Sequence, residues 1–151
     1  MDFQPKSHEQ IRRLIEKGVS IPNPSTLDIV DDVSIDRISP KNVKLYPGCK
    51  IYGGKTVISS GCQLGYEAPV TMEDCQLGEA VELKGGFFSK SVFLEKSSMG
   101  LGAHVREGCL IEVQAGGAHC VGLKQTILFP FVTLGSLINF CDCLMAGGTS
   151  R

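Results

Sequence analysis

An aliphatic residue returns about every six positions through the middle of the chain. The gaps between successive members are mostly six or seven residues, and the members are Leu45, Ile51, Val57, Leu64, Val70, Leu77, Leu83, Val92, Met99, Val105 and Ile111. An α-helix repeats every 3.6 residues and a simple strand every two, so neither produces this pattern. A six-residue period is typical of a parallel β-helix, in which short strands coil around one stacked core. The pattern therefore predicts an all-β fold, although such coils host many different activities.

Composition restricts the class of protein. The 151 residues are enough for one domain, and 42% hydrophobic with 21% charged residues indicates a globular chain. The net charge is −1 with both signs interspersed, so we expect no nucleic-acid partner. Seven cysteines without a signal-peptide pattern indicate reduced thiols and a cytoplasmic protein. The uncharged run 125–141 contains Pro130 and Gly135 and is slightly short for a span, so we expect no membrane segment.

Residues 5–18 have the pattern of a helix. Ser7 and Gln10 have the spacing of a capping box, and Gly18 is a suitable stop. The residues that share its apolar face are Ile11, Leu14, Ile15 and Val19. The helix either covers one end of the solenoid or is a connecting arm from a larger ancestor; both interpretations stay open at this point.

The segments after this helix complete the division of the chain. A proline-rich stretch is an extended lead-in, so we expect an arm in residues 1–34 and a β-helix domain in residues 35–151. The glycine pairs 85–86 and 116–117 are predicted corners, and the second also interrupts the repeat. Residues 129–131, Phe-Pro-Phe, are a predicted rigid turn.

The strands expected at 132–134 and 137–144 are apolar on both faces. A solenoid strand turns only one face toward its core, so apolarity on the other face predicts a partner surface. We expect a homo-oligomer, most simply a homotrimer.

Three parts of the chain carry a resemblance to a known family. Leu14-Ile-Glu-Lys-Gly-Val-Ser-Ile-Pro-Asn-Pro resembles the arm that leads into the acetyltransferase domain of bifunctional UDP-N-acetylglucosamine pyrophosphorylase/glucosamine-1-phosphate N-acetyltransferases. The hexads of residues 45–111 resemble the left-handed β-helix of that domain. Residues 81–88 and 122–151 are similar to proteins described as UDP-N-acetylglucosamine pyrophosphorylase-related. The left-handed coil is implied by this resemblance alone, since it runs against the usual crossover rule.

The resemblance implies a hexapeptide-repeat transferase related to sugar-nucleotide metabolism. In the acetyltransferase half of the family, an Arg and, eighteen residues later, a Lys contact the sugar phosphate or nucleotide-sugar. Arg106 and Lys124 match those positions. Eighteen residues make one coil of three hexads, so the two cations are expected on one edge, where a guanidinium and an ammonium suit a phosphate. The alternative is two solvated cations without a ligand. The nucleotidyltransferase half, with its Gly-rich nucleotide loop, has no counterpart in this chain.

The general base of that family has no match. Its His and Tyr follow the Lys by twelve and fifteen residues, where this chain has Ser136 and Asn139. A hydroxyl without a partner base does not take a proton from an amine as an imidazole does. No catalytic residue is therefore assigned, and the alternative function is a non-catalytic binding or assembly module. The acetyl-CoA-binding coils of the family lie further along, so we expect acetyl-CoA only in a longer form. Residues 145–151 resemble an interruption of the coil and not a capped end, so we interpret the chain as truncated.

Metal sites and carboxylate bases are weaker hypotheses. Some β-helix trimers bind zinc through three histidines, but His8, His104 and His119 lack the close pair that such a site needs, so we expect no metal. A thiol site would combine Cys141 and Cys143, two residues apart on one strand face, with Cys109, His119 and Cys120; the alternative is small buried side chains that fill the core. The candidate bases near the two cations are Glu107, Glu112 and Asp142, which are otherwise solvated.

Overall fold

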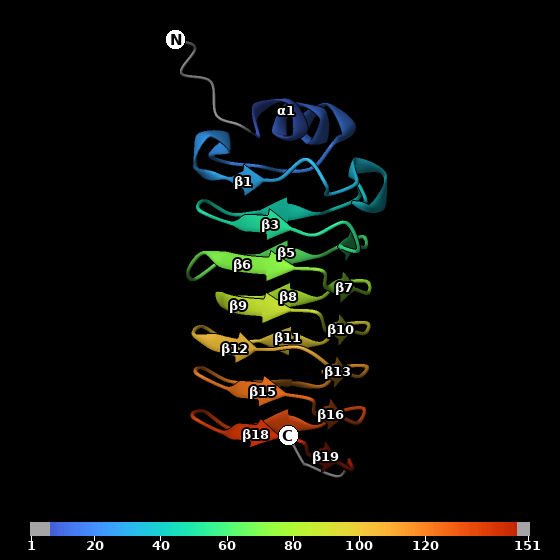
Figure 1. The fold of residues 1–151 in the computed structure, drawn as a ribbon, viewed down its shortest axis with the longest axis vertical. Helices are drawn as coiled ribbons and strands as arrows, with labels where there is room; N and C mark the ends of the chain where they lie inside the picture. Colours follow the sequence, from blue (N-terminus) through green and yellow to red (C-terminus); the bar gives the residue numbers. More distant parts are fainter. Residues whose placement is uncertain (1–6, 148–151) are drawn as a thin grey trace.

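The chain folds into a three-sided β-solenoid with one helix at its N-terminal end (Figure 1). This computed structural model describes residues 7–147. Helix α1 spans His8–Lys17, and the short 3-10 turns η1 (Pro24–Thr26) and η2 (Ile35–Arg37) follow it. The predicted parallel β-helix with a short N-terminal helix is confirmed.

The described strands form three parallel sheets, one for each side of the coil. Sheet 1, which faces the viewer in Figure 1, contains β1 (Asp28–Ile29), β3 (Lys50–Tyr52), β6 (Val70–Glu73), β9 (Gly86–Ser89), β12 (Ala103–Val105), β15 (Gly122–Lys124) and β18 (Asn139–Cys141). Sheet 2 contains β4 (Val57–Ile58), β7 (Gln76–Leu77), β10 (Val92–Phe93), β13 (Leu110–Ile111), β16 (Ile127–Leu128) and β19 (Leu144–Met145). Sheet 3 contains β2 (Lys44–Leu45), β5 (Gln63–Leu64), β8 (Glu82–Leu83), β11 (Ser98–Met99), β14 (Gly116–Gly117) and β17 (Thr133–Leu134).

The coil is left-handed. Followed downward from α1 in Figure 1, the chain crosses the front from left to right in sheet 1, turns back through sheet 2 and returns leftward behind in sheet 3. Parallel strands are usually joined in the right-handed sense. The handedness agrees with the one that the family resemblance implies.

Three columns of inward side chains make the core. They are Ile51, Met72, Phe88, Val105 and Leu123 in sheet 1, Ile58, Leu77, Phe93, Ile111 and Leu128 in sheet 2, and Leu45, Leu64, Leu83, Met99 and Leu134 in sheet 3. Two members of the predicted six-residue pattern, Val57 and Val92, lie one position before the core residue and are only half-buried. The prediction is wrong at these two positions. Each is followed by a second apolar residue that takes the core position, and spacing alone does not distinguish such neighbours.

The corner prediction is confirmed at Gly85, which lies at the bend between β8 and β9, but it is wrong for the pair 116–117. Gly86 begins β9, and Gly116 and Gly117 form β14, which pairs with β11 and β17. A Cβ at Gly86 would collide with the Ala103 carbonyl oxygen, and one at Gly116 with the Ser98 carbonyl oxygen. The close approach of neighbouring coils favours glycine at both positions, and at Gly86 the φ of 131° favours it as well.

Helix α1 lies across the N-terminal end of the solenoid (Figure 1). Gly18 ends it as expected, with φ of 120° and its N–H donating to the Leu14 and Ile15 carbonyls. The predicted capping box is wrong: Ser7 Oγ donates to the Leu27 carbonyl at 3.3 Å instead. Gln10 Nε2 donates to Val33 O at 3.0 Å. The two side chains thus tie the helix to the segment beneath it. Residues 5 and 6 of the predicted helix lie outside the described residues.

The apolar face of α1 is narrower than predicted. Ile11 and Leu14 are buried, as is Val19 just beyond the helix, whereas the Ile15 residue is 43% exposed. The lead-in is part of the solenoid, since β1 pairs with β3 and Ser20 bridges to Lys44. The division of the chain at residue 34 stays a prediction.

The last two coils expose several large apolar residues. Residues 129–131 form the predicted turn, and the exposed residues of this region are Phe129, Phe131, Leu137 and Leu144. The stretch 137–144 is not a single strand, because Asp142 adopts φ of 56° and turns the chain between β18 and β19. Within residues 7–147, no helix has the length and apolarity needed to cross a membrane. The expected interruption at residues 145–151 falls largely outside the described residues.

Candidate functional site

The outward face of sheet 1 carries the two predicted anion-binding residues. His104 lies opposite Gly122 in the register of β12 and β15. Just after β12, Arg106 donates its backbone N–H to the Leu123 carbonyl at 2.8 Å, which places Arg106 beside Lys124 on neighbouring coils. Arg106 is exposed and Lys124 is half-buried. The structure thus brings the two cations to one edge, which we call the cation edge.

Two buried hydroxyls fix the backbone beneath the cation edge. Ser91 Oγ donates to the Arg106 carbonyl at 2.8 Å, and Thr126 Oγ1 donates to the Lys124 carbonyl at 2.9 Å. Ser91 Oγ also accepts from the Cys109 N–H at 3.2 Å. Both hydroxyl residues have almost no exposed surface. Short hydroxyl side chains hold nearby backbone groups in this way, so both cations extend from fixed backbone positions.

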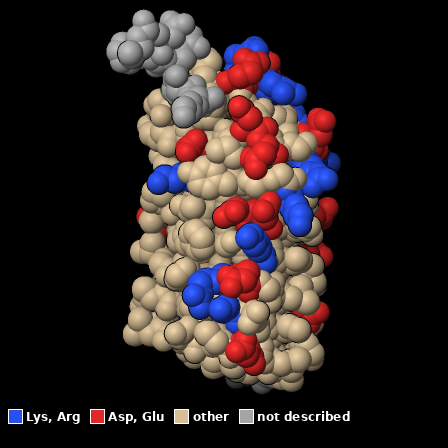
Figure 2. All heavy atoms as spheres, in the orientation of Figure 1, with Lys and Arg blue, Asp and Glu red and all other residues tan. Residues whose placement is uncertain are grey.

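A carboxylate accompanies the two cations. Lys124 Nζ lies 3.6 Å from Glu107 Oε1. The pKa of Glu107 is lowered chiefly by a hydrogen bond from its own backbone N–H, and further by the charges of Lys124 and Arg106. Because both side chains are substantially exposed, solvent screens this ion pair. Figure 2 shows such mixed charges as a band along the front of the solenoid.

The edge has the chemistry of an anion site rather than of a carboxylate base. Adjacent strands lie about 4.8 Å apart, so a planar guanidinium and an ammonium on neighbouring coils can contact one phosphate or two linked phosphates. Glu107 is unsuited to take protons because its pKa is lowered. Glu112 follows β13 in sheet 2, on another side of the coil from the cations. Asp142 is exposed at the turn after β18.

The two residues at the positions of the family's base lie at and beside the start of β18. Asn139 opposes Gly122, and a Cβ at Gly122 would lie 2.7 Å from Asn139 Oδ1. The Asn139 amide therefore leans over the glycine. Ser136 Oγ is hydrogen-bonded to His119 Nδ1 at 2.7 Å. Sequence reasoning missed this pair, although the spacing of seventeen residues between them is close to one coil.

The structure separates the residues of the hypothetical metal sites. Cys141 ends β18 and Cys143 follows the turn at Asp142, so the two thiols do not share a strand face. His104 packs edge-on against Phe87, with ring centroids 5.3 Å apart. Within residues 7–147, no three His, Cys, Asp or Glu residues are placed to hold a metal ion.

Four of the cysteines are buried in the core, and they are Cys49, Cys62, Cys75 and Cys109. Burial raises the pKa of Cys62 to about 11 and that of Cys75 to about 12. These thiols stay protonated near neutral pH and act as small core side chains.

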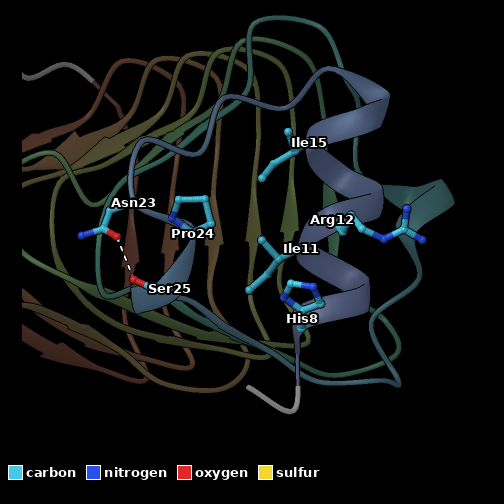
Figure 3. Close-up of a pocket in the computed structure, with 7 residues that line it drawn as sticks. All are labelled: His8, Ile11, Arg12, Ile15, Asn23, Pro24 and Ser25. Atoms are coloured by element: carbon cyan, nitrogen blue, oxygen red, sulfur yellow. Dashed lines mark hydrogen bonds between the residues drawn. The ribbon is translucent and has the colours of Figure 1, made fainter. Parts of the chain in front are cut away.

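Two hollows of about 450 Å³ lie away from the cation edge. The first is between α1 and residues 23–25 and is mainly apolar, with Ile11, Ile15 and Pro24 in its wall (Figure 3). The second lies over sheet 3 and is bounded by charged and imidazole side chains, including Lys84 and His119. Only the second contains a residue of the Ser136–His119 pair.

Comparison with known proteins gives a consistent relationship. No protein-family model matches the chain. Among curated proteins, 117 residues (77% of this chain) are 31% identical to a bifunctional protein GlmU from Trichlorobacter lovleyi. The chain is similar to one segment of bifunctional GlmU. It is 29% identical over 120 residues to the GlmU of Thermotoga maritima, and 42% identical over 73 residues to that of Syntrophotalea carbinolica.

The similarity to GlmU covers most of this chain but little of the relatives. It spans 77% and 79% of the chain in the first two comparisons, and 24% and 25% of those GlmU proteins. The third covers 48% of the chain and 14% of the relative. The chain therefore spans about a quarter of the length of the curated GlmU proteins that it matches, and the resemblance inferred from the sequence is confirmed for that segment.

Proposed function

We propose that the chain is a hexapeptide-repeat transferase of sugar-nucleotide metabolism that binds a sugar phosphate or nucleotide-sugar at the cation edge. The observation that supports this most directly is the placement of Arg106 beside Lys124 on a rigid sheet face. The similarity to a segment of GlmU supports the same class of protein. A phosphate would replace Glu107 as the partner of Lys124, because it offers more charge and more acceptor oxygens.

The neighbouring surface suits the remainder of such a ligand. Gly122 adds no side chain to the face of sheet 1, and the Asn139 amide leans over it. His104, opposite Gly122 on the preceding coil, provides a second polar group. Sugar hydroxyls need donors and acceptors of this kind, placed around a phosphate that fixes the orientation.

A binding module without catalysis is the second candidate. It is favoured by Ser136 and Asn139 at the positions where the related acetyltransferases have their base and its neighbour. Binding and catalysis are therefore tested separately.

The first experiment is a calorimetric titration with UDP-N-acetylglucosamine and, in parallel, with glucosamine 1-phosphate. We expect binding by the intact chain and at least about tenfold weaker binding by Arg106→Ala, since a hydrogen bond to a charged group contributes about 1.5–3 kcal/mol. Lys90→Ala is the matched control, because Lys90 is a cation on the preceding coil. No binding of either compound, or an equal loss in both variants, would contradict the proposed site.

We also propose that the last coils form the interface of a homotrimer. The exposed Phe131 and Leu137 residues, 51% and 73% accessible, support a covered surface. Light scattering at micromolar concentration tests this: the expected mass is three chains, and a monomer mass would show that the trimer is wrong. A cytoplasmic location stays a prediction.

A further inference from the structure

Two aromatic rings lie on the outward face of sheet 1, next to the cation edge. Phe87 of β9 and His104 of β12 are opposite each other in the register of these strands. Their ring centroids are 5.3 Å apart, and the ring planes meet at 84°. Phe87 is 37% exposed, and His104 is exposed as well. In such an edge-to-face pair one ring covers a single face of the other, so the pair itself does not use the remaining ring faces.

The coil that follows β12 adds no bulky group beside this ring pair. The residue opposite His104 on β15 is Gly122, which has no side chain. Asn139 lies opposite Gly122 on the next coil, and its amide leans over the glycine. The rings are therefore flanked by a low strip of backbone with one carboxamide, a group that both donates and accepts hydrogen bonds. A planar base can stack on exposed rings of this kind.

The ring pair and the cation edge are joined by the same strands. His104 lies in β12 and Arg106 just after it, and both are exposed. Gly122 and Lys124 have the same separation within β15. Alternate residues of a strand share one face and lie about 7 Å apart. A ribose can bridge that separation between a base and its phosphate, with its hydroxyls beside the Asn139 amide.

The cations can bind two linked phosphates, and their surroundings set the direction of the ligand. Arg106 and Lys124 are on neighbouring coils, about 4.8 Å apart, so each can contact its own phosphate. On the side away from the rings, the turns of these coils carry the exposed polar residues Gln125 and Asp142. Polar side chains suit the hydroxyls of a hexose but offer no ring to a base. The base therefore belongs on the Phe87 side of the phosphates.

We propose that the cation edge takes a nucleoside diphosphate sugar, and that Phe87 and His104 are the specificity residues that hold its base. This inference rests on the proposed function and narrows it, because a sugar monophosphate reaches the cations but not the rings. The base contributes stacking, while the phosphates accept charge-assisted hydrogen bonds from Arg106 and Lys124. No covalent step is involved, so the inference applies equally to a transferase and to a binding module.

Calorimetry with matched ligands isolates the contribution of the base. UDP-N-acetylglucosamine and ADP-glucose carry different bases, and glucosamine 1-phosphate carries none. We expect at least one nucleotide-sugar to bind about tenfold or more tightly than glucosamine 1-phosphate, in line with the stacking of a base on aromatic side chains. Phe87→Leu should remove most of this advantage and change the affinity for glucosamine 1-phosphate less than about twofold, because a ligand without a base does not reach the rings.

A second variant and a matched control keep the test independent of folding. His104→Ala should show the same selective loss as Phe87→Leu. Tyr66→Leu is the control, since Tyr66 is 64% exposed and pairs edge-on with Tyr46, but lies at the corner between sheets 3 and 1. It should change every affinity less than about twofold, as expected for a distant site. Light scattering should give one mass for the three variants and the intact chain; a change of mass in Phe87→Leu would assign the ring to a subunit contact instead.

The outcomes separate failure of the inference from failure of the proposed function. If the intact chain binds none of the three ligands, the proposed function is wrong and this inference is wrong with it. If glucosamine 1-phosphate binds as tightly as both nucleotide-sugars, or if Phe87→Leu and Tyr66→Leu act alike, the cation edge stands and the role of the rings is overturned. A loss confined to the nucleotide-sugars, with nuclear Overhauser contacts between the base protons and the Phe87 ring in the intact chain, is the supporting result.

Discussion

Two of the corners that run along the solenoid differ sharply in chemistry. The corner between sheets 1 and 2 is charged, with Asp74, Lys90 and Asp142 at turn positions of positive φ. The corner between sheets 3 and 1 is more apolar. Its exposed residues include Tyr66, Leu101 and Leu137, which are 64%, 40% and 73% exposed. The repeat determines the inward residues at both corners. The outward residues are not constrained by the core, so their charge and polarity can differ between the two corners.

Backbone conformation sharpens this difference. An aspartate tolerates the left-handed region because its short polar side chain bonds locally, whereas Leu137 at φ of 66° is unfavourable there. Leu137 thus combines backbone strain with an exposed apolar side chain. Solvation accounts for the charged corner, while the exposed residues of the apolar corner support the proposed subunit interface.

The largest expected effect is on assembly. Leu137→Asp should convert a trimer to monomers at micromolar concentration, because a charge would be buried without a partner in the interface. Gln125→Asp is the matched control: Gln125 also has positive φ and is exposed, but it lies at the charged corner. Light scattering measures the masses. Equal masses for the two variants and the intact chain would remove Leu137 from the interface.

The next effect concerns stability beneath the charged corner. Ser91→Ala should lower the free energy of unfolding by about 1–3 kcal/mol, because the Arg106 carbonyl and the Cys109 N–H lose a buried partner. Ser91→Cys should recover part of this loss, since Cys75 and Cys109 occupy the equivalent position on adjacent coils. Urea unfolding measures the change. The exposed Ser136→Ala serves as control and should stay within about 0.5 kcal/mol.

The reactivity of the native cysteines tests the same two corners without introducing a charged residue. Cys120 is exposed at the apolar corner and Cys141 at the end of β18, whereas Cys62 and Cys75 are buried with raised pKa values. We expect a disulfide reagent to modify Cys141 fastest, Cys120 several-fold more slowly in the oligomer, and the two buried thiols only on unfolding. Peptide mass mapping gives the order. Equal rates at Cys120 and Cys141 in the intact chain would indicate that nothing covers the apolar corner.

The smallest effect is electrostatic. The lowered pKa of Glu107 means that its stabilising interaction is present above the pKa of the unfolded chain and is lost as pH falls through the folded value. Lys124→Ala should raise this pKa toward the ordinary value without restoring it, since the hydrogen bond from its own backbone N–H is the larger cause. An NMR titration of the Glu107 carboxyl tests this. An unchanged pKa in the variant would show that the ion pair is not formed in solution.

Sequence reasoning recovered the coil and the position of the cation edge, but it failed where adjacent residues compete. Spacing selected Val57 and Val92, while Ile58 and Phe93 face the core. It placed the pair 116–117 at a corner, because it cannot detect how closely neighbouring coils approach. It treated Ser136 as a hydroxyl without a base, because the partner is on the previous coil.

The sequence by itself determined the period and two cations separated by one coil. These features repeat along the chain, so one-dimensional spacing contains them. Tertiary structure alone decided that Ser91 and Thr126 hold the backbone of the cations, that Glu107 accompanies Lys124, and that His119 meets Ser136. Each of these contacts joins different coils or turns, and its geometry depends on how the coils are stacked and where each corner turns.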